Sequence, residues 1–252
     1  MDSVVPFVLV SDHAGRAIPQ SLGTLGLCDT DRARHIAWDI GVAGLGERLS
    51  DLLGATLVAQ AYSRLVIDCN RRPGHPTSIA SVSDSTPVPG NEGLRQDQRA
   101  AREHAIFAPY HAAIATGLDT RRAAGQPTVL VALHSFTPRL RTPSRPTPGD
   151  ADGHRPWHVG VLHNHDPRFA LILRDLLAAE GELVVGNNAP YALSDDDDYT
   201  VPVHGEQRGL PHVEIEIRQD LIADADGEAA WAARLARLLP LAWQLFGQRF
   251  GC

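Results

Sequence analysis

Side chains that can bind a metal ion or move a proton follow several short apolar runs of this sequence. Asp12 and His13 come directly after FVLVS, His134 comes directly after VLVAL, and two glutamates alternate with isoleucine in residues 212–218. Imidazole and carboxylate groups are the usual ligands of a catalytic zinc ion, which keeps one position open for water. These residue types therefore indicate metal-assisted hydrolysis, with a nearby carboxylate taking the proton of the attacking water.

A second polar group lies in RLVIDCNRR, residues 64–72. An arginine can hold a substrate carboxylate through two parallel hydrogen bonds, which a lysine cannot match. Arg71 is a candidate for that role. Arg64 and Asp68 are expected to form a salt bridge, and Asp68 is expected to support Arg71.

Short apolar runs that alternate with helix-period segments predict the scaffold for these residues. Such alternation is typical of a mostly parallel α/β sheet covered on both faces, with ligands bound at the carboxyl ends of the strands. The pattern predicts strands over 5–10, 55–60, 64–68, 127–133, 159–162, 183–186 and 212–217. It predicts helices over 31–53, 94–124 (with a break near Pro109), 167–179 and 228–250.

Three long segments rich in Pro, Gly, Ser or Asp do not fit these elements: 71–93, 137–157 and 187–209. Loops of this length inside a domain often cover or form a binding site. We expect His204, in the last of them, to reach the substrate. The acidic run 195–198 is expected to be a solvated loop tip.

The composition indicates a soluble cytoplasmic protein. The net charge of −7 over 252 residues argues against nucleic acid or an anionic membrane as the main partner. Three cysteines without metal-like spacing favour a reducing compartment, and no apolar run has the length of a membrane span. A single domain over residues 1–252 is expected, because no linker divides the chain.

Five motifs in register resemble the N-formylglutamate amidohydrolase family, which is similar in fold to zinc carboxypeptidases and aspartoacylases. They are SDHAG, HIAWDIG, YSRLVIDCNR, LHSFTP and GLPHVEIEIRQDLI, and they span residues 11–222. The resemblance implies a three-layer α/β/α domain with a mixed, mostly parallel sheet. It also implies a hydrolase with one zinc ion that cuts the amide between an acyl group and an acidic amino acid.

The same resemblance implies roles for individual residues. His13 and His134 would be the imidazole ligands. Related carboxypeptidases place a glutamate three residues after the first histidine, but Arg16 stands there in this sequence. We expect Asp39, on the helix predicted over 31–53, to be the third ligand; Asp12 is the alternative and is expected to point away from the site.

The remaining roles concern the reaction itself. Glu216 matches the family's catalytic glutamate, which takes a proton from water and delivers it to the leaving amine; Glu214 is the alternative base. Arg64 would stabilise the oxyanion, while Asn70 and Arg71 would hold a substrate carboxylate. N-formyl-L-glutamate is the expected substrate.

Two other functions stay open at this point. The scaffold could serve a carboxypeptidase or a cell-wall peptide amidase, or a non-catalytic relative that binds a metal or small ligand.

Overall fold

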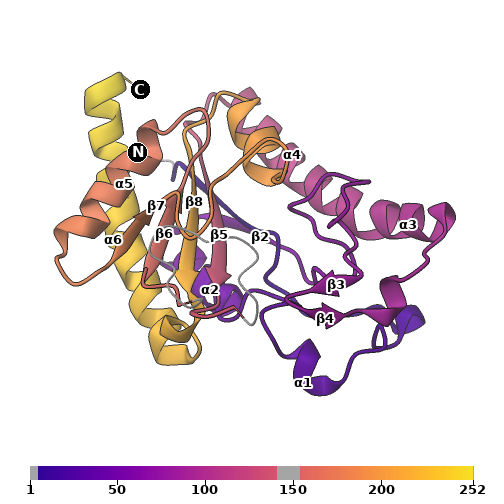
Figure 1. Cartoon of the computed structure of the whole chain (residues 1–252). Helices are drawn as coiled ribbons and strands as arrows, with labels where there is room; N and C mark the ends of the chain where they lie inside the picture. The colour runs from indigo at the N-terminus through magenta and orange to yellow at the C-terminus, as the bar shows by residue number, and fades with distance from the viewer. Residues whose placement is uncertain (1–4, 141–153, 252) are drawn as a thin grey trace.

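A six-stranded sheet forms the centre of the chain in a computed structural model that describes residues 5–140 and 154–251 (Figure 1). Its strands lie in the order β2-β1-β5-β8-β6-β7. Their bounds are β1 Phe7–Ser11, β2 Thr56–Ala59, β5 Val129–Phe136, β6 Val159–Leu162, β7 Val185–Asn187 and β8 His212–Arg218. The first four strands of that order are parallel, β6 is antiparallel to β8, and β7 is parallel to β6. The expected mixed, mostly parallel sheet is confirmed.

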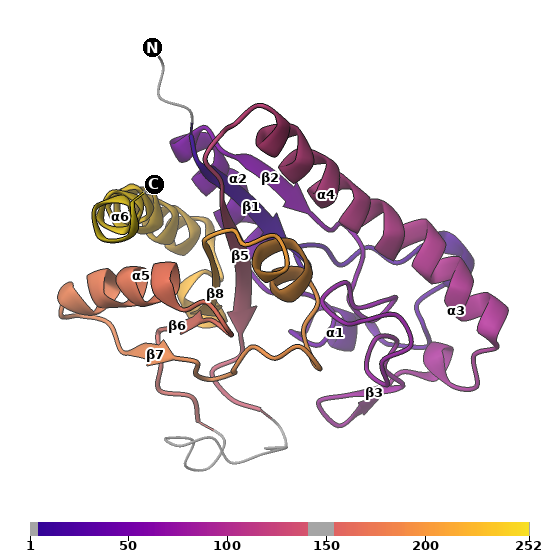
Figure 2. The ribbon, with the colours of Figure 1, turned by 90° about the horizontal axis from the view of Figure 1, so that it is seen from above.

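Helices cover both faces of this sheet (Figure 2). On one face, α2 (Val42–Leu53), α5 (Arg168–Ala179) and α6 (Ala225–Phe250) pack together. On the other face lies α4 (Ala108–Ala123), which follows α3 (Gln96–Arg102). The short helix α1 (Asp29–Arg32) and a two-stranded hairpin, β3 (Val82–Ser83) with β4 (Thr86–Pro87), lie outside the main sheet.

Alternation along the strands separates the core from the reactive side chains. On the face covered by α2, α5 and α6, odd-numbered residues such as Val131 and Ile215 are buried in one apolar cluster. Even-numbered residues of β5, such as Ala132, belong to the cluster on the α4 face. Since side chains alternate between the faces, His134 and its register partner Glu216 point to the α4 side of the sheet.

The helix expected over 31–53 is wrong in its first half. α1 ends at Arg32, and α2 begins only at Val42. Gly41, which precedes α2, has a φ of +82°, and a Cβ there would lie 1.9 Å from the carbonyl oxygen of Ile222. Only glycine accommodates both conditions without strain. Asp39 therefore lies on a turn, not on a helix.

Two other expected elements differ from the structure. The strand expected over 64–68 is a succession of turns, closed by a hydrogen bond from Val66 N to Ser63 O of 2.9 Å. The helix expected over 94–124 is α3 and α4 joined by a π-helical turn, Glu103–Phe107. Pro109 itself lies in the first turn of α4, directly after the π-helical turn.

Within the described residues, no helix is both long enough and apolar enough to cross a bilayer.

Candidate active site

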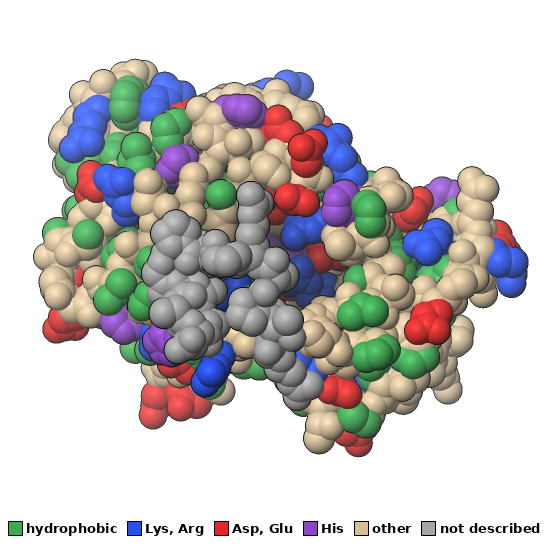
Figure 3. All heavy atoms as spheres, viewed as in Figure 1, with side chains coloured by type: hydrophobic (Ala, Val, Ile, Leu, Met, Phe, Trp, Pro, Cys, Tyr) green, Lys and Arg blue, Asp and Glu red, His purple; other side chains and the backbone are tan. Residues whose placement is uncertain are grey.

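A cavity of about 710 Å³ lies beside the carboxyl ends of β1 and β5 and the glutamates of β8. In Figure 3, arginine, acidic and histidine side chains gather in a hollow of this face. All of the site residues predicted from the sequence except His204 line the cavity: His13, Asp39, Arg64, Asn70, Arg71, His134 and Glu216. The sheet thus brings together residues that are far apart in the sequence.

His13 turns into the cavity just beyond the end of β1. The turn depends on Gly15, because a Cβ at this position would lie 2.0 Å from the carbonyl oxygen of Ala61. The ring of His13 is buried, and its Nε2 lies 2.7 Å from Asp68 Oδ1. Its Nδ1 is buried without a hydrogen-bond partner. One nitrogen is therefore oriented by a carboxylate while the other is left for a ligand.

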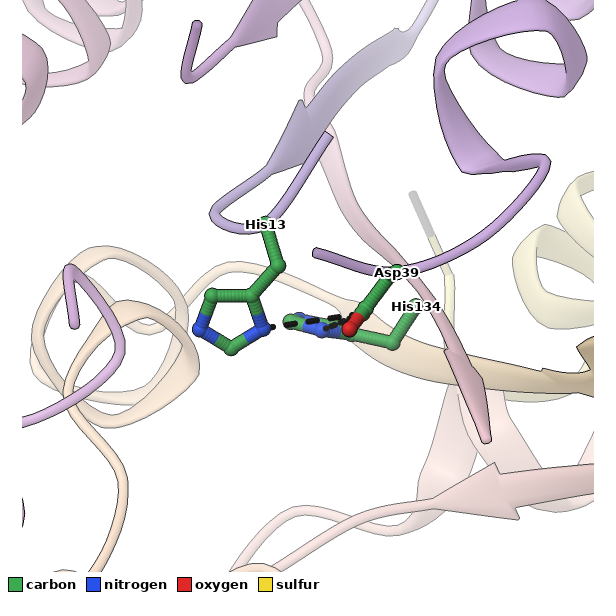
Figure 4. Close-up of side chains that lie close together, drawn as sticks. All are labelled: His13, Asp39 and His134. Atoms are coloured by element: carbon green, nitrogen blue, oxygen red, sulfur yellow. Dashed lines mark hydrogen bonds and ion pairs between the residues drawn. The ribbon is translucent and has the colours of Figure 1, made fainter. Parts of the chain in front are cut away.

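Asp39 joins the two histidines (Figure 4). Its Oδ2 lies 2.9 Å from His134 Nδ1 and 3.5 Å from His13 Nδ1. Two hydrogen bonds hold Asp39 in place. The backbone N–H of Asp39 donates to the carbonyl oxygen of His13, and the backbone N–H of Ser135 donates to Asp39 Oδ2. Asp39 can approach both histidines because it lies on a turn and not on the expected helix.

These three residues fit a zinc ion. One ligand atom from each of His13, Asp39 and His134 can be chosen so that all lie within 4.8 Å of one another. Two imidazoles, one carboxylate and an open side toward a cavity are the donor set of a catalytic zinc site. The other nitrogen of each imidazole faces a carboxylate. His13 Nε2 faces Asp68, and His134 Nε2 lies 3.4 Å from the carboxylate of Asp12. Such carboxylates orient metal-binding histidines.

Asp12 thus lies behind His134 and, unlike Asp39, does not line the cavity. It is fully buried, and Thr200 Oγ1 donates a hydrogen bond of 2.6 Å to its Oδ1. Burial by itself would raise the pKa of Asp12, but the His134 hydrogen bond and charge lower it to about 2. For Asp39, the charges of the two histidines and the His134 hydrogen bond likewise outweigh burial and hold its pKa well below the usual range. Both carboxyl groups are therefore ionised at neutral pH.

The two glutamates of β8 face the same space. Glu216 is the register partner of His134, and Glu214 Oε2 lies 3.8 Å from His134 Nε2. In each glutamate, Oε2 is buried without a hydrogen-bond partner. Burial raises the pKa of Glu216 to about 7 and that of Glu214 well above its usual range. A carboxyl group with a pKa near neutrality can both accept and return a proton.

Arg64 stands at the cavity wall with a carboxylate on either side. Its guanidinium lies 2.7 Å from Asp68 Oδ2 and 3.5 Å from Asp39 Oδ1. The expected Arg64–Asp68 salt bridge is present. Asp68 therefore contacts both Arg64 and His13 and holds them in one network.

Asn70 and Arg71 meet Asp198 at the cavity wall. Arg71 Nη1 donates to Asp198 Oδ1 at 3.1 Å, and Asn70 Nδ2 donates to the same oxygen at 3.2 Å. The Asn70 side-chain oxygen accepts the backbone N–H groups of Tyr199 and Thr200. Asp198 is buried, so the prediction of a solvated loop tip is wrong for this residue, while residues 195–197 are exposed. A run of four aspartates gives no sign of which one turns inward.

A model of the N-formylglutamate amidohydrolase family matches residues 5–223. The chain belongs to this family. A comparison with curated protein sequences found no match. Among solved structures, the chain is similar to the gene product Atu2144 from Agrobacterium tumefaciens, with 38% identity and a TM-score of 0.88 over 96% of this chain and 92% of that one. It is also similar to the N-formylglutamate amidohydrolase from Ralstonia eutropha JMP134, with 21% identity and a TM-score of 0.69 over 96% and 94% of the two chains. The second likeness shows a shared fold.

His204 lies outside the cavity of this amidohydrolase-family chain. It is 3% exposed, and its Nε2 lies 3.0 Å from His111 Nδ1. His111 Nε2 lies 2.8 Å from the carbonyl oxygen of Cys69, so it donates there and leaves Nδ1 to accept from His204. Both rings are therefore neutral and tie α4 to the π-helical segment Val201–Glu206. This placement gives His204 no contact with the space available to a substrate.

Arg155 and Tyr191 are two of the cavity residues that the sequence did not predict. Arg155 Nη1 donates to the Tyr191 hydroxyl at 2.7 Å. Each lies in one of the long loops, 137–157 and 187–209. These loops were expected to form a binding site, but nothing in their composition indicates which side chain turns inward.

Proposed function

We propose that this chain hydrolyses the amide bond of a small N-acyl amino acid, with N-formyl-L-glutamate as the first candidate, and that it uses one zinc ion. His13, Asp39 and His134 would hold the ion. The observation that carries the proposal is the placement of these three side chains beside Glu216 in one cavity. Membership of an amidohydrolase family supports the reaction class.

The residues around the cavity have separate roles in the proposed reaction. Zinc, when bound, supplies Lewis acidity to the amide carbonyl. Glu216 takes a proton from water as the water oxygen bonds to the acyl carbon, and Arg64 stabilises the charge that develops on the carbonyl oxygen. The C–N bond then breaks, and Glu216 returns the proton to the leaving amine. With N-formyl-L-glutamate the products are formate and glutamate.

Asn70 and Arg71 support a substrate carboxylate in this proposal. The Arg71 side chain is partly exposed, and Asn70 and Asp198 hold its Nη1 in place. Among the described residues, its Nη2 and Nε make no hydrogen bond, so one edge of the guanidinium is available to a substrate.

The substrate class is tested by assaying a panel of N-formyl, N-acetyl and N-succinyl amino acids for released amine. The zinc-loaded protein is expected to cleave the N-formyl derivative of glutamate fastest. A protein that cleaves short peptides but none of the panel would overturn the small-amide assignment.

The base is tested with Glu216→Gln, which removes the proton acceptor and keeps the shape of the side chain. We expect kcat to fall at least about 100-fold, since positioned acid–base groups contribute 10²–10⁴-fold, while bound zinc stays near one equivalent. Glu182→Gln, at an exposed position, is the matched control and should leave kcat unchanged. Full activity in Glu216→Gln would instead assign the base to Glu214.

A further inference from the structure

Arg155 is a buried guanidinium without a carboxylate partner among residues 5–140 and 154–251. It is 3% exposed, yet no aspartate or glutamate of the described chain lies within ion-pair distance of it. Its Nε is buried without a hydrogen-bond partner. Taking a charge out of water without compensation is costly, so a bound anion would stabilise this guanidinium.

The other arginines of the cavity differ from Arg155 in this respect. Arg64 pairs with Asp39 and Asp68, and Arg71 pairs with Asp198. Of the arginines in the described lining, Arg155 alone brings positive charge that no carboxylate of residues 5–140 and 154–251 balances. An anionic ligand entering the cavity therefore gains most from meeting Arg155.

The surroundings of Arg155 hold its guanidinium in a fixed orientation. Its carbon Cζ lies 4.7 Å from the centre of the Tyr191 ring and 5.8 Å from that of Phe136. Its Nη1 donates to the Tyr191 hydroxyl, and its backbone N–H donates to Pro138 O at 3.0 Å. A planar group held between aromatic rings and a hydroxyl keeps its remaining N–H groups aimed in set directions, which suits a carboxylate.

β6, the strand that follows Arg155, also runs beside the proposed base. Arg155 precedes β6, whose residue Gly160 is the register partner of Glu216. Both Arg155 and Glu216 line the same cavity. A substrate whose amide bond lies at Glu216 can therefore extend a charged end toward Arg155.

We infer that Arg155, oriented by Tyr191, binds a carboxylate of the substrate and makes the site select that acid over its amide. This inference rests on the proposed function and adds a determinant of specificity to it. A neutral amide in the same place would leave the buried guanidinium unpaired, and sites that must leave a buried polar group unpaired reject such analogues strongly.

The test compares Arg155→Gln with the native protein on three substrates: N-formyl-L-glutamate, N-formyl-L-glutamine and the α-amide of N-formyl-L-glutamate. We expect KM for the diacid to rise about 100-fold or more and the preference for the diacid over one of the two amides to fall to near unity. Arg139→Gln, an exposed change on the same loop, is the matched control and should preserve both preferences. A loss of equal size on all three substrates, or no loss, overturns the inference.

Arg155→Lys keeps the inference testable if the glutamine variant does not fold. Lysine retains the charge and loses the two-pronged geometry, so KM for the diacid is expected to rise about tenfold with the far-ultraviolet spectrum unchanged. A native KM in this variant would contradict a role in carboxylate binding.

Binding without turnover separates this inference from the proposed function. Calorimetry should show that the zinc-loaded native protein binds L-glutamate more tightly than L-glutamine or than the α-amide of L-glutamate, and that Arg155→Gln removes that difference. If the native protein cleaves N-formyl-L-glutamate but binds L-glutamate and both amides equally, or if Arg155→Gln keeps the native differences, only the inference fails. If the binding difference appears without cleavage of any panel member, only the proposed function fails.

Discussion

His204 shows how the surroundings of a single residue fix its protonation state. Burial, followed by the repulsion between the rings of His111 and His204 when both carry a proton and by the charge of Arg208, lowers the pKa of His204 to about 4 from an ordinary value of 6.5. The folded state therefore keeps this ring neutral, whereas the unfolded chain binds a proton at pH 6.5. Stability that depends on the neutral ring is present above pH 6.5 and is lost as the pH falls toward 4, by at most about 3 kcal/mol.

Urea unfolding between pH 7 and 4 measures this loss. We expect His204→Gln, which can still donate to His111 Nδ1, to show a shallower decline in unfolding free energy than the native protein. His104→Gln, at an exposed position, is the control and should decline like the native protein. An identical decline in all three proteins would contradict the assignment of the neutral ring to His204.

Single residues of the site were predictable where a strand positions them. His134 and Glu216 lie on β5 and β8, and alternation along a strand determines which face a side chain occupies. His13 lies just beyond β1, close enough for the same reasoning. Arg155 and Asp198 lie on loops whose conformation depends on contacts with distant segments, so no local pattern predicted their inward orientation.

At the level of elements, the turn before α2 decides whether Asp39 reaches the histidines. We expect Gly41→Ala to destabilise the protein by about 3 kcal/mol or more, because a positive φ costs a non-glycine residue about 1–3 kcal/mol and the added Cβ also overlaps the Ile222 carbonyl oxygen. Urea unfolding measures this change. Zinc affinity should fall too, because Asp39 lies two residues before the strained position.

Gly117→Ala is the matched control for this substitution. Gly117 lies inside α4, and a Cβ there would meet nothing within 4 Å. Alanine should therefore stabilise the helix by about 0.5–1 kcal/mol. A Gly41→Ala protein as stable as the control would contradict the steric argument.

The sequence predicted where most helices and strands lie, and it failed where one residue overrides a periodic pattern. The apolar period continues through 31–53, but Gly41 and the contacts of Asp39 break the helix. In the same way, the apolar run 64–68 reads as a strand, although its residues form turns that present Arg64 and Asp68 to the cavity. Tertiary contacts decided both cases.

At the scale of the whole molecule, the sequence did not predict the directions of the outer strands β6 and β7. Helical crossovers predicted parallel neighbours, and β2, β1, β5 and β8 are parallel. The antiparallel β6 follows the loop 137–157, whose length permits either direction. That reversal places Gly160 and Leu162 opposite the glutamates of β8, and Arg155, which precedes β6, lines the same cavity.

Zinc should couple the stability of the whole molecule to the site, because its three proposed ligands come from β5, the end of β1 and the turn before α2. A ligand that binds only the folded state adds about 2.7 kcal/mol at a concentration 100 times its Kd. For a chain of this size we therefore expect zinc to raise Tm by about 5–10 °C over the chelator-treated protein.

His13→Asn should remove most of that increase, and Asp220→Asn, at an exposed position, should retain it. Magnesium should have little effect, because it prefers oxygen ligands over imidazole. An equal zinc-dependent increase in His13→Asn and the native protein would place the ion elsewhere. Scanning calorimetry of the three proteins with zinc or with chelator, and of the native protein with magnesium, decides between these outcomes.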